Sequence, residues 1–312
     1  MAVNPHGIHH VTAIASDPQR NVDFYTHVLG LRLVKQTVNF DAPNVWHLYY
    51  GDASGNPSSI LTFFPWPGVV KGKEGAGLTT ATSFSVPPES IGFWHQRLVG
   101  LGLEVLKPEV RGESEVLTLF DYDGMRLELV ATSGDSRSGW DGEADIPAEH
   151  AVRGLHSVTL TERSIDPTAG MLTNLLGMEL STETNSSAHF AMGLGGSGAR
   201  VKVDGGVQER GLQAGGTVHH VAFSAPDLPT MELWQQELLS RGVQVTQIMD
   251  RQYFKSIYFR EPGGVLFEIA TDDPGFATDE PLLELGRKLK LPPWLEPSRE
   301  QIQQSLPPIR VH

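Results

Sequence analysis

Two histidine doublets and one acid in an apolar run are the residues of this sequence best suited to metal chemistry. His9 and His10 lie near the start of the chain, and His219 and His220 open its last quarter. Glu268 stands among apolar neighbours in a strand-like run, where an ionised carboxylate is costly unless another charge compensates it. A metal ion would supply that charge. Taken alone, each histidine is more readily explained as a hydrogen-bonded strand residue.

The segment that carries Glu268 shows a definite order of elements. It opens with an apolar-polar alternation around the second doublet, followed by apolar residues at helical spacing over Leu228–Arg241. Gly242 ends that helix, and a Pro-Gly-Gly turn separates the last two of three strand-like runs. The runs are Val243–Met249, Tyr253–Phe259 and Val265–Thr271. The predicted order is β-α-β-β-β.

The same unit occurs four times along the chain, which indicates an internal repeat. The copies span about residues 7–68, 78–133, 153–205 and 216–273. Their predicted helices are Arg20–Leu29, Ile91–Leu101, Pro167–Leu176 and Leu228–Arg241. The closing strand repeats too, because GMRLELVA matches GVLFEIAT and places Glu128 opposite Glu268. We therefore predict an α+β fold of four βαβββ units that form two open-barrel cups.

The segments outside the units divide the chain into predicted halves, residues 1–140 and 141–312. Thr132–His150 is rich in Ser, Gly and Asp and is expected to be a linker. Residues 274–312 are expected to form a C-terminal arm on a neighbouring unit or subunit. Within this arm, Glu280–Lys290 is predicted to be a short helix, and Leu291–Trp294 an extended segment that docks an aromatic side chain.

Composition bounds the class of protein. A chain of 312 residues, 39% of them hydrophobic, can bury a sizeable core, and it has no apolar run of membrane-spanning length. The formal net charge of −13 argues against nucleic acids and anionic membranes as partners. With no cysteine, disulfides, thiolate ligands and cysteine nucleophiles are excluded. No signal-like segment opens the chain, so we expect a cytoplasmic protein and leave a homo-oligomer open.

Several segments resemble the vicinal oxygen chelate superfamily, which includes glyoxalase I, the bleomycin resistance proteins and the extradiol dioxygenases. They are GIHHVT, HLYYGD, LTFFPWP, HHVAF and SIYFREPGGVLFEIATDDPGF, and the closer similarity is to ring-cleaving dioxygenases that act on hydroquinones. The resemblance covers essentially the whole chain. It implies a non-haem Fe(II) dioxygenase, with Mn(II) as an alternative metal, acting on a small aromatic substrate and O2.

The resemblance also implies which residues bind the metal. One histidine of each doublet and the glutamate of the last strand are ligands in that superfamily, and they correspond to His10, His220 and Glu268. The choice within each doublet follows from phase, because His10 and His220 each stand seven residues before an aspartate at the end of the strand. Two histidines and one carboxylate on separate strands form a facial triad, which leaves positions open for substrate and O2.

Further functional positions are implied around the triad. Tyr258, Arg251 and His219 correspond to catalytic residues, and His9 and Thr12 to substrate-binding residues. The Tyr258 phenol could hydrogen-bond a substrate hydroxyl or carry its proton. Arg251 could stabilise an anion through charge-assisted hydrogen bonds. The structural alternatives are a cross-strand aromatic contact for Tyr258, and a surface ion pair with Asp250 or Asp272 for Arg251.

The first histidine of each doublet poses a geometric problem. Strict strand alternation places His9 and His219 on the face opposite the ligands, so they reach the site only where a strand starts irregularly. Some residues of the strand that contains His47, Tyr49 and Tyr50 are expected to line the cup. Phe63, Phe64 and Trp66 are expected in the core or at an interface instead of at the substrate.

The predicted ligand set separates two kinds of chemistry. Glyoxalase-type isomerases use a fourth protein ligand, an acid from the other unit of the cup, but here Leu61 or Thr62 stands at that position. The missing carboxylate favours an oxygenase. The alternatives are a metal-dependent isomerase or lyase that consumes no O2, and a protein that binds an aromatic compound without turnover.

Two pairings of the units are conceivable. Adjacent pairing would join His156 of the third unit to the fourth, but His156 follows Leu155 where a doublet would have histidine. Ala81 stands where the second unit would need a histidine, so His156 and Glu128 make only half a site. We therefore predict that units one and four close the metal cup, and that units two and three form a metal-free cup with a vestigial half-site.

Overall fold

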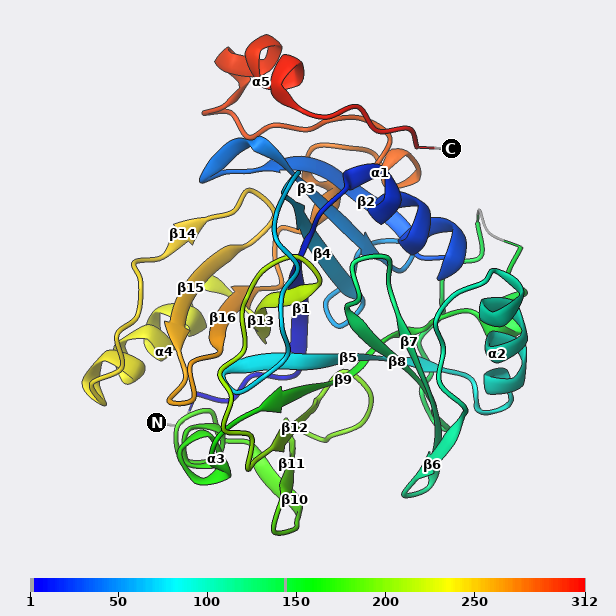
Figure 1. Cartoon of the computed structure of the whole chain (residues 1–312). Coiled ribbons are helices and arrows are strands. Elements are labelled where there is room, and N and C mark those ends of the chain that lie inside the picture. Colours follow the sequence, from blue (N-terminus) through cyan, green and yellow to red (C-terminus); the bar gives the residue numbers. More distant parts are fainter. Residues whose placement is uncertain (1–2, 143–144, 312) are drawn as a thin grey trace.

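The strands of the protein form two curled eight-stranded sheets (Figure 1). The computed structural model describes residues 3–142 and 145–311. Four units follow one another along the chain, and each contains a strand, a helix and three further strands. The predicted α+β fold with two cups is confirmed.

The first sheet joins the first and the last unit of the chain. Its strand order is β14-β15-β16-β13-β1-β4-β3-β2, and β1 and β13 are antiparallel neighbours at its centre. Strands from the two ends of the sequence therefore lie side by side (Figure 1). The strands are β1 (Ile8–Ala15), β2 (Arg32–Asn39), β3 (Ala42–Gly51), β4 (Ile60–Pro65), β13 (Thr217–Ala225), β14 (Met249–Asp250), β15 (Lys255–Arg260) and β16 (Leu266–Thr271).

The second sheet joins the two middle units in the same way. Its order is β10-β11-β12-β9-β5-β8-β7-β6, with β5 and β9 antiparallel at the centre. The strands are β5 (Leu78–Val86), β6 (Glu109–Arg111), β7 (Ser114–Phe120), β8 (Arg126–Ala131), β9 (Gly154–Thr161), β10 (Glu179–Glu183), β11 (Ser187–Ala191) and β12 (Arg200–Asp204).

The helices begin where the first strand of each unit has ended. Asp17 and Asp227, the aspartates that follow the two doublets, are N-caps, and their side chains accept from the backbone N–H groups of Arg20 and Thr230. The helices are α1 (Pro18–Asp23, continued by a π-helical turn at Phe24–Val28), α2 (Ile91–Gly100), α3 (Ile165–Asn174), α4 (Leu228–Ser240) and α5 (Arg299–Ser305). Short 3-10 turns lie at Pro88–Ser90, Ala148–His150, Phe276–Thr278, Leu282–Glu284 and Glu296–Ser298.

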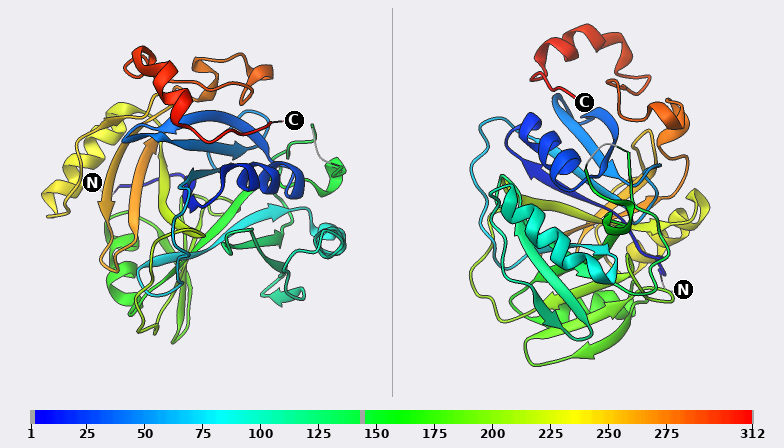
Figure 2. Two further views of the ribbon diagram at one scale, coloured as in Figure 1. Left: turned by 45° about the horizontal axis from the view of Figure 1, so that its top comes forward. Right: turned by 90° about the vertical axis from the view of Figure 1, so that its right-hand side faces the viewer.

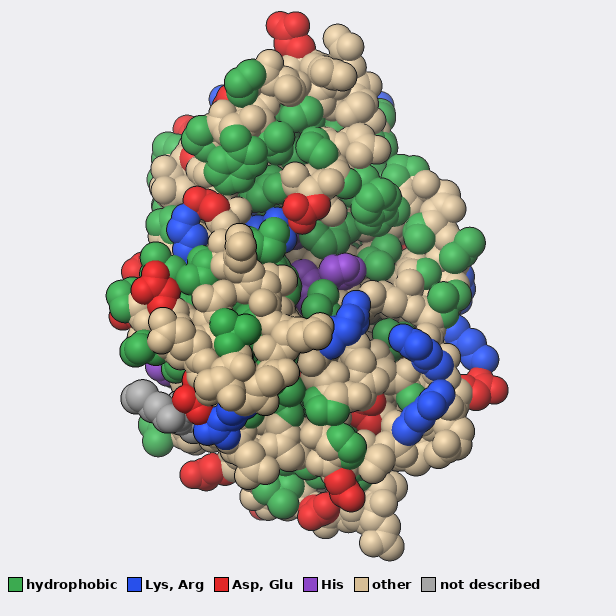
Figure 3. Space-filling model, turned by 90° about the vertical axis from the view of Figure 1, so that its left-hand side faces the viewer, with side chains coloured by type: hydrophobic (Ala, Val, Ile, Leu, Met, Phe, Trp, Pro, Cys, Tyr) green, Lys and Arg blue, Asp and Glu red, His purple; other side chains and the backbone are tan. Residues whose placement is uncertain are grey.

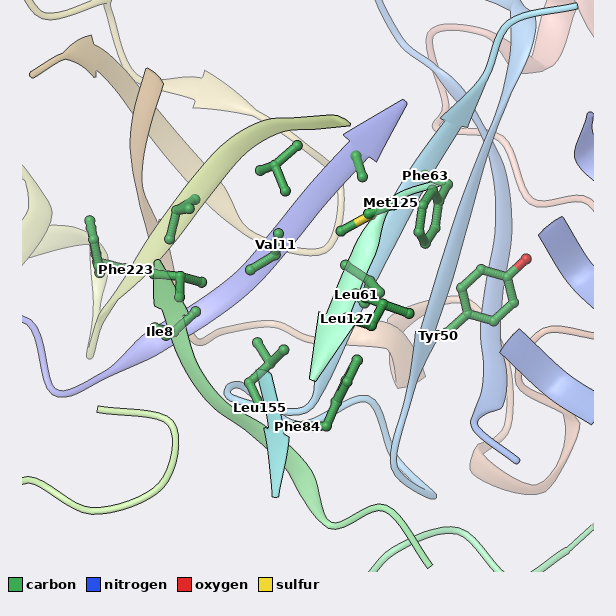
Figure 4. Close-up of a cluster of buried hydrophobic side chains, with 14 of the residues drawn as sticks. Ile8, Val11, Tyr50, Leu61, Phe63, Phe84, Met125, Leu127, Leu155 and Phe223 are labelled. Carbon is green, nitrogen blue, oxygen red and sulfur yellow. The ribbon is translucent and has the colours of Figure 1, made fainter. Parts of the chain in front are cut away.

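One hydrophobic core connects the two sheets. Figure 4 shows Ile8 and Phe223 of the first sheet close to Phe84 and Leu155 of the second. These four side chains are fully buried. Because each buried side chain of this size contributes roughly 1.5–3 kcal/mol, the contact fixes the two cups relative to each other.

Two predicted elements are wrong. Val243–Met249 is not a full strand, because only Met249 and Asp250 pair with β15. Glu280–Lys290 is not a helix but contains one 3-10 turn, at Leu282–Glu284. The reason is that Gly286 has a φ of 75° and packs closely on the carbonyl of Leu33, so the segment follows β2 instead of coiling.

The C-terminal arm packs on the first unit. Gln36 of β2 donates to the carbonyl of Gly286 and accepts from the backbone N–H of Lys290. The buried Lys35 ammonium pairs with Asp279 and Glu280. Figure 2 shows the arm lying over β2 and β3.

The segment Thr132–His150 connects the middle units largely without regular structure, as predicted, although residues 143–144 lie outside the described residues. Among the described helices, none combines the length and the apolar character that a bilayer span requires.

Candidate metal centre

Three ligand-type side chains converge in the first sheet. His10 comes from β1, His220 from β13 and Glu268 from β16, three strands that are adjacent in the sheet. The two histidine Nε2 atoms are 3.3 Å apart, and Glu268 Oε2 lies 3.4 Å from that of His10 and 2.8 Å from that of His220. All three side chains are buried. In the described part of the chain, this is the one group of three or more such residues with ligand atoms within 4.8 Å of one another.

The separation of these atoms suits a divalent metal ion. Two ligand atoms bound at right angles, with bonds of about 2.1 Å, stand about 3 Å apart, and the three observed separations are close to that value. Glu268 Oε2 is buried and has no hydrogen-bond donor, a deficiency that a cation would satisfy. The other carboxylate oxygen accepts from the Ser256 hydroxyl. The residues present therefore fit a facial triad of two imidazoles and one carboxylate.

Two β-bulges turn the histidine doublets toward this point. In the β1–β13 ladder the register shifts between Ile8 and His10, and again opposite His219, so His9 and His219 are the extra residues. Alternation fails at both positions. As a result, His9 Nδ1 lies 2.8 Å from His10 Nδ1, and His219 Nδ1 lies 2.7 Å from His220 Nδ1. Each ligand histidine is thus supported by the histidine before it.

The hydrogen bonds of His9 define which nitrogen of His10 is free. Burial lowers the pKa of His9 to about 3, so its ring is neutral, and the ring also donates to the backbone carbonyl of Thr271. Its proton is then on the nitrogen that faces Thr271, so Nδ1 accepts from His10 Nδ1–H. His10 Nε2 is left with a lone pair directed at Glu268, which is the form a metal ligand requires.

The protonation states of His220 and Glu268 also suit metal binding. Burial lowers the pKa of His220 and, to about 3, that of His219, which favours neutral rings. Burial would raise the pKa of Glu268, but its two histidine neighbours hold it well below its usual range. A neutral His220 and an ionised Glu268 are the protonation states in which these groups bind metals.

Thr62 occupies the position that a fourth protein ligand would need. Thr12 of β1 pairs with Thr62 of β4 as Ala222 of β13 pairs with Glu268 of β16, so Thr62 is the counterpart of the glutamate. Its hydroxyl is bonded to Thr12 Oγ1 at 2.9 Å and to His47 Nε2 at 2.8 Å. The first unit therefore contributes a hydroxyl and an imidazole here instead of an acid.

Tyr258 and Arg251 stand together beside the triad. Tyr258 pairs with Glu268 across β15 and β16, and its ring contacts that of His220 at 5.7 Å between centroids. Arg251 Nε donates to the Tyr258 hydroxyl at 3.2 Å. The ion pair of Arg251 is formed with Asp41 of the β2–β3 turn, and not with Asp250 or Asp272. Burial is the main reason why the pKa of Tyr258 is raised, so the phenol keeps its proton.

These residues surround a cavity of about 340 Å³. Figure 3 shows histidine side chains at the floor of a hollow in one face of the molecule, with hydrophobic side chains gathered above it. The cavity is within the range of small-molecule sites. Besides the triad, it is lined by Asn39, Phe40, Asp41, His47, Tyr49, Phe64, Trp66, His219, Arg251, Phe254, Tyr258 and Leu266.

A family model matches residues 7–129 and 154–269, which together cover most of the chain, and its description is the Glyoxalase/Bleomycin resistance protein/Dioxygenase superfamily. The chain belongs to this superfamily. The predicted resemblance is confirmed. Individual relatives match nearly the full length of the chain.

Two relatives that match over nearly the whole chain are named as dioxygenases. The Bacillus subtilis protein "Putative ring-cleaving dioxygenase MhqO" is 42% identical over 100% of this chain and 99% of its own. The "Chlorohydroquinone/hydroquinone 1,2-dioxygenase" of Sphingobium indicum is 32% identical over 96% of this chain and 95% of its own.

Solved structures agree with the fold. The crystal structure of a "putative dioxygenase" from Bacillus subtilis superimposes with a TM-score of 0.95 at 40% identity, covering 100% of this chain and 99% of the other. Glyoxalase I from Zea mays has a TM-score of 0.63 at 16% identity, over 85% of this chain and 92% of its own. The second likeness concerns the fold alone.

His9 and Thr12 are the two positions predicted to bind substrate, and both are buried beside residues of the site. His9 is buried behind His10 and packs on Phe254, with ring centroids 5.1 Å apart. Thr12 is fully buried and is bonded to Thr62. Neither is among the described residues that line the cavity. His9 contacts the site through His10, and Thr12 contacts it through Thr62.

The cavity also contains residues whose role the sequence did not reveal. Phe64 and Trp66, expected in the core or at an interface, line the cavity. Phe40 and Asp41 of the β2–β3 turn line it as well, and Asp41 pairs there with Arg251, which follows β14. No local pattern marks these residues, since their position depends on the tertiary fold. The nearest signal in the sequence for a cavity wall was the run of aromatic residues around Phe64, FFPW.

The corresponding position in the second sheet lacks the triad. Ser157 pairs with Ser83 as His10 pairs with Ala222, so His156 is the counterpart of His9 and not, as predicted, of a ligand. The bulges shift the register by one residue, which strict alternation did not anticipate. Glu128 is compensated by Arg111 and Arg126, whose guanidinium nitrogens lie 2.8 and 2.9 Å from its Oε1.

Proposed function

We propose that the protein is a non-haem Fe(II)-dependent ring-cleaving dioxygenase that acts on a dihydroxylated aromatic compound, a hydroquinone, and inserts both atoms of O2. The observation that carries the proposal is the buried triad of His10, His220 and Glu268 with Thr62 at the fourth position. Three protein ligands leave room for a substrate and O2 together. The names of the relatives support the ring-cleaving class and the hydroquinone substrate.

Fe(II) held by the triad would supply the electron transfer between the aromatic hydroxyl and O2. The side chains of the protein bind and orient the ring. Phe40, Phe64, Trp66 and Phe254 form apolar walls around it. Such walls exclude water and strengthen the polar contacts inside the cavity.

Two phenol side chains, those of Tyr258 and Tyr49, line the cavity. The Tyr258 hydroxyl, oriented by Arg251, is placed to donate to a ring hydroxyl or to exchange its proton. The Tyr49 hydroxyl is hydrogen-bonded to His47 Nδ1 at 2.9 Å, and His47 Nε2 is hydrogen-bonded to the Thr62 hydroxyl. Burial lowers the pKa of His47 well below its usual value, so this ring orients neighbouring hydroxyls as a neutral group.

The test is anaerobic reconstitution of the protein with Fe(II), followed by measurement of O2 uptake with hydroquinones and catechols. We expect one O2 per ring cleaved, with 1,4-dihydroxybenzene preferred over 1,2-dihydroxybenzene. Glu268→Gln, which keeps the shape of the side chain and removes its charge, is the matched control and should abolish uptake. Turnover of a carbonyl substrate without O2 uptake would instead establish an isomerase.

A further inference from the structure

Among the described residues that line the cavity, Arg251 and Asp41 form an ion pair between the last and the first unit of the chain. Arg251 follows β14, and Asp41 forms the turn between β2 and β3. Arg251 Nη1 lies 3.0 Å from Asp41 Oδ2. The arginine side chain is 17% exposed and the aspartate 65%, so the guanidinium belongs to the cavity wall while its counter-ion stands at the rim. Apart from histidines, the charged side chains among the described lining residues are Asp41, Arg251 and Glu268.

The guanidinium has a fixed position relative to the triad. Its Nε donates to the Tyr258 hydroxyl, and its central carbon lies 5.3 Å from the Tyr258 ring centroid. A turn holds the backbone, because Arg251 N–H donates to the carbonyl of Phe254. Since Tyr258 contacts His220, Arg251 lies one side chain away from the triad. A substituent on a ring bound at the triad can therefore reach the Arg251 guanidinium.

The second sheet contains an arginine, Arg111, at the position that corresponds to Arg251. Arg111 and Arg251 stand the same number of residues before Glu128 and Glu268. Arg111 binds Glu128 directly, at 2.8 Å. In the first sheet Arg251 is paired with Asp41, so Asp41 takes the role of counter-ion and leaves Glu268 to the triad.

We infer that Arg251 and Asp41 form a charge filter, which makes the site favour uncharged dihydroxylated rings over rings that carry a carboxylate. Asp41 neutralises Arg251, the one lysine or arginine among the described residues that line the cavity, and its own charge repels a ring carboxylate. A carboxylate left without a partner in a water-poor cavity is costly. Without Asp41, the guanidinium would bind a ring carboxylate through charge-assisted hydrogen bonds. The placement of the ring rests on the proposed function, but the inference can be tested without turnover.

The experiment compares the binding of phenol and 4-hydroxybenzoate, which differ by one carboxylate. Neither has two ring hydroxyls, so binding to the anaerobic Fe(II)-loaded protein can be followed by calorimetry without ring cleavage. Asp41→Asn should shift the ratio of the two Kd values toward 4-hydroxybenzoate by about tenfold, the effect of a charge-assisted hydrogen bond. The double variant Asp41→Asn/Arg251→Met should lose this shift. Asp250→Asn removes an exposed carboxylate that is next to Arg251 in sequence, does not line the cavity and pairs with Lys255, and it should leave the ratio unchanged.

The outcomes separate the filter from the proposed function. If both probes bind but Asp41→Asn leaves the ratio unchanged, the filter is wrong and the aromatic site stands. An equal shift in Asp250→Asn would also refute the filter, because it would reveal a general effect of net charge. If neither probe binds any variant, the aromatic site fails and the filter with it. Should the double variant not fold, the comparison of Asp41→Asn with Asp250→Asn decides alone.

Discussion

Among single residues, the first histidine of each doublet has the most specific task. His9 accepts the Nδ1 proton of His10 and donates to Thr271, so it determines which nitrogen of His10 faces Glu268. A partner of this kind fixes both the tautomer and the orientation of a ligand ring. His219 is placed in the same way beside His220.

We expect His9→Ala to weaken Fe(II) affinity by about 10–100-fold, the usual effect of losing a partner behind a metal ligand. Affinity would be measured by competition with a chelator of known strength. His156→Ala, which changes the counterpart in the second sheet, is the control and should leave the affinity as it is. Unchanged affinity in His9→Ala would show that the doublet has only a packing role.

Removal of a ligand itself should have a larger effect. His220→Ala takes away one of three donor atoms, and elemental analysis should find the bound iron reduced from about one ion per chain to less than about a tenth. The fold should persist, because the neighbouring strand residues still pack. Full occupancy in this variant would disprove the assignment of the triad, as would loss of iron in His156→Ala.

Tyr258 should affect turnover more than metal binding. Tyr258→Phe removes one hydroxyl beside the cavity and keeps the ring that contacts His220. Loss of a group that positions or transfers a proton typically costs about 10²–10⁴-fold in rate, so kcat should fall by about 10² while iron content stays near that of the unaltered protein. Equal losses of iron and rate would show instead that the ring has a structural role at the triad.

The sequence identified the residues of the triad better than the residues around them. His10, His220 and Glu268 could be found because repeated units place them in matching phases. The off-by-one assignment of His156 came from bulges, which depend on pairing between distant strands and leave no local mark. Asp41 and Trp66 could not be assigned to the cavity from sequence. The β2–β3 turn and the end of β4 bring them there only in the folded chain.

At the level of elements, a buried acid pair joins the end of β9 to the β15–β16 turn. Glu162 is hydrogen-bonded to Glu261, which also accepts from Thr168 Oγ1 and from the N–H groups of Gly263 and Val265. Burial and the charge of Glu261 raise the pKa of Glu162 to about 8. The two acids therefore share one proton at neutral pH, and this proton connects the second sheet to the first.

This pair should make stability depend on pH. Glu162 has a raised pKa in the folded state, so its contribution is fully present below about pH 4.5 and is lost as pH rises through about 8. Glu162→Gln keeps a donor toward Glu261 at every pH. Relative to the unaltered protein, this variant should gain about 1–2 kcal/mol in unfolding free energy between pH 5 and pH 9, measured by denaturant titration. A difference that does not change with pH would exclude the shared proton.

For the molecule as a whole, the two sheets form one core, although the three predicted metal ligands come only from the first sheet. The residues that bury the junction belong to all four units. We therefore expect a single calorimetric transition, with equal calorimetric and van't Hoff enthalpies. Iron should move this one transition to higher temperature as its concentration rises. Two separate transitions, of which iron shifts only one, would show that the cups unfold independently.

The overall architecture followed from the sequence because four copies of one pattern constrain each other. Helix positions were found to within a few residues, since N-cap aspartates and terminal glycines mark them. The path of the C-terminal arm could not be predicted, because Gly286 and contacts with β2 determine it and no local periodicity encodes them. The short β14 likewise reflects an edge position, where few partners hold a strand in place.

The central position of β1 beside β13 also determines when the site can form in a cell. His10 leaves the ribosome 258 residues before Glu268. At about 5–20 residues per second, β1 waits for tens of seconds before its partner strand exists, whereas the second sheet can pair earlier. The three predicted metal ligands are therefore brought together only after β16 has been made, and we expect metal loading to follow the synthesis of that strand.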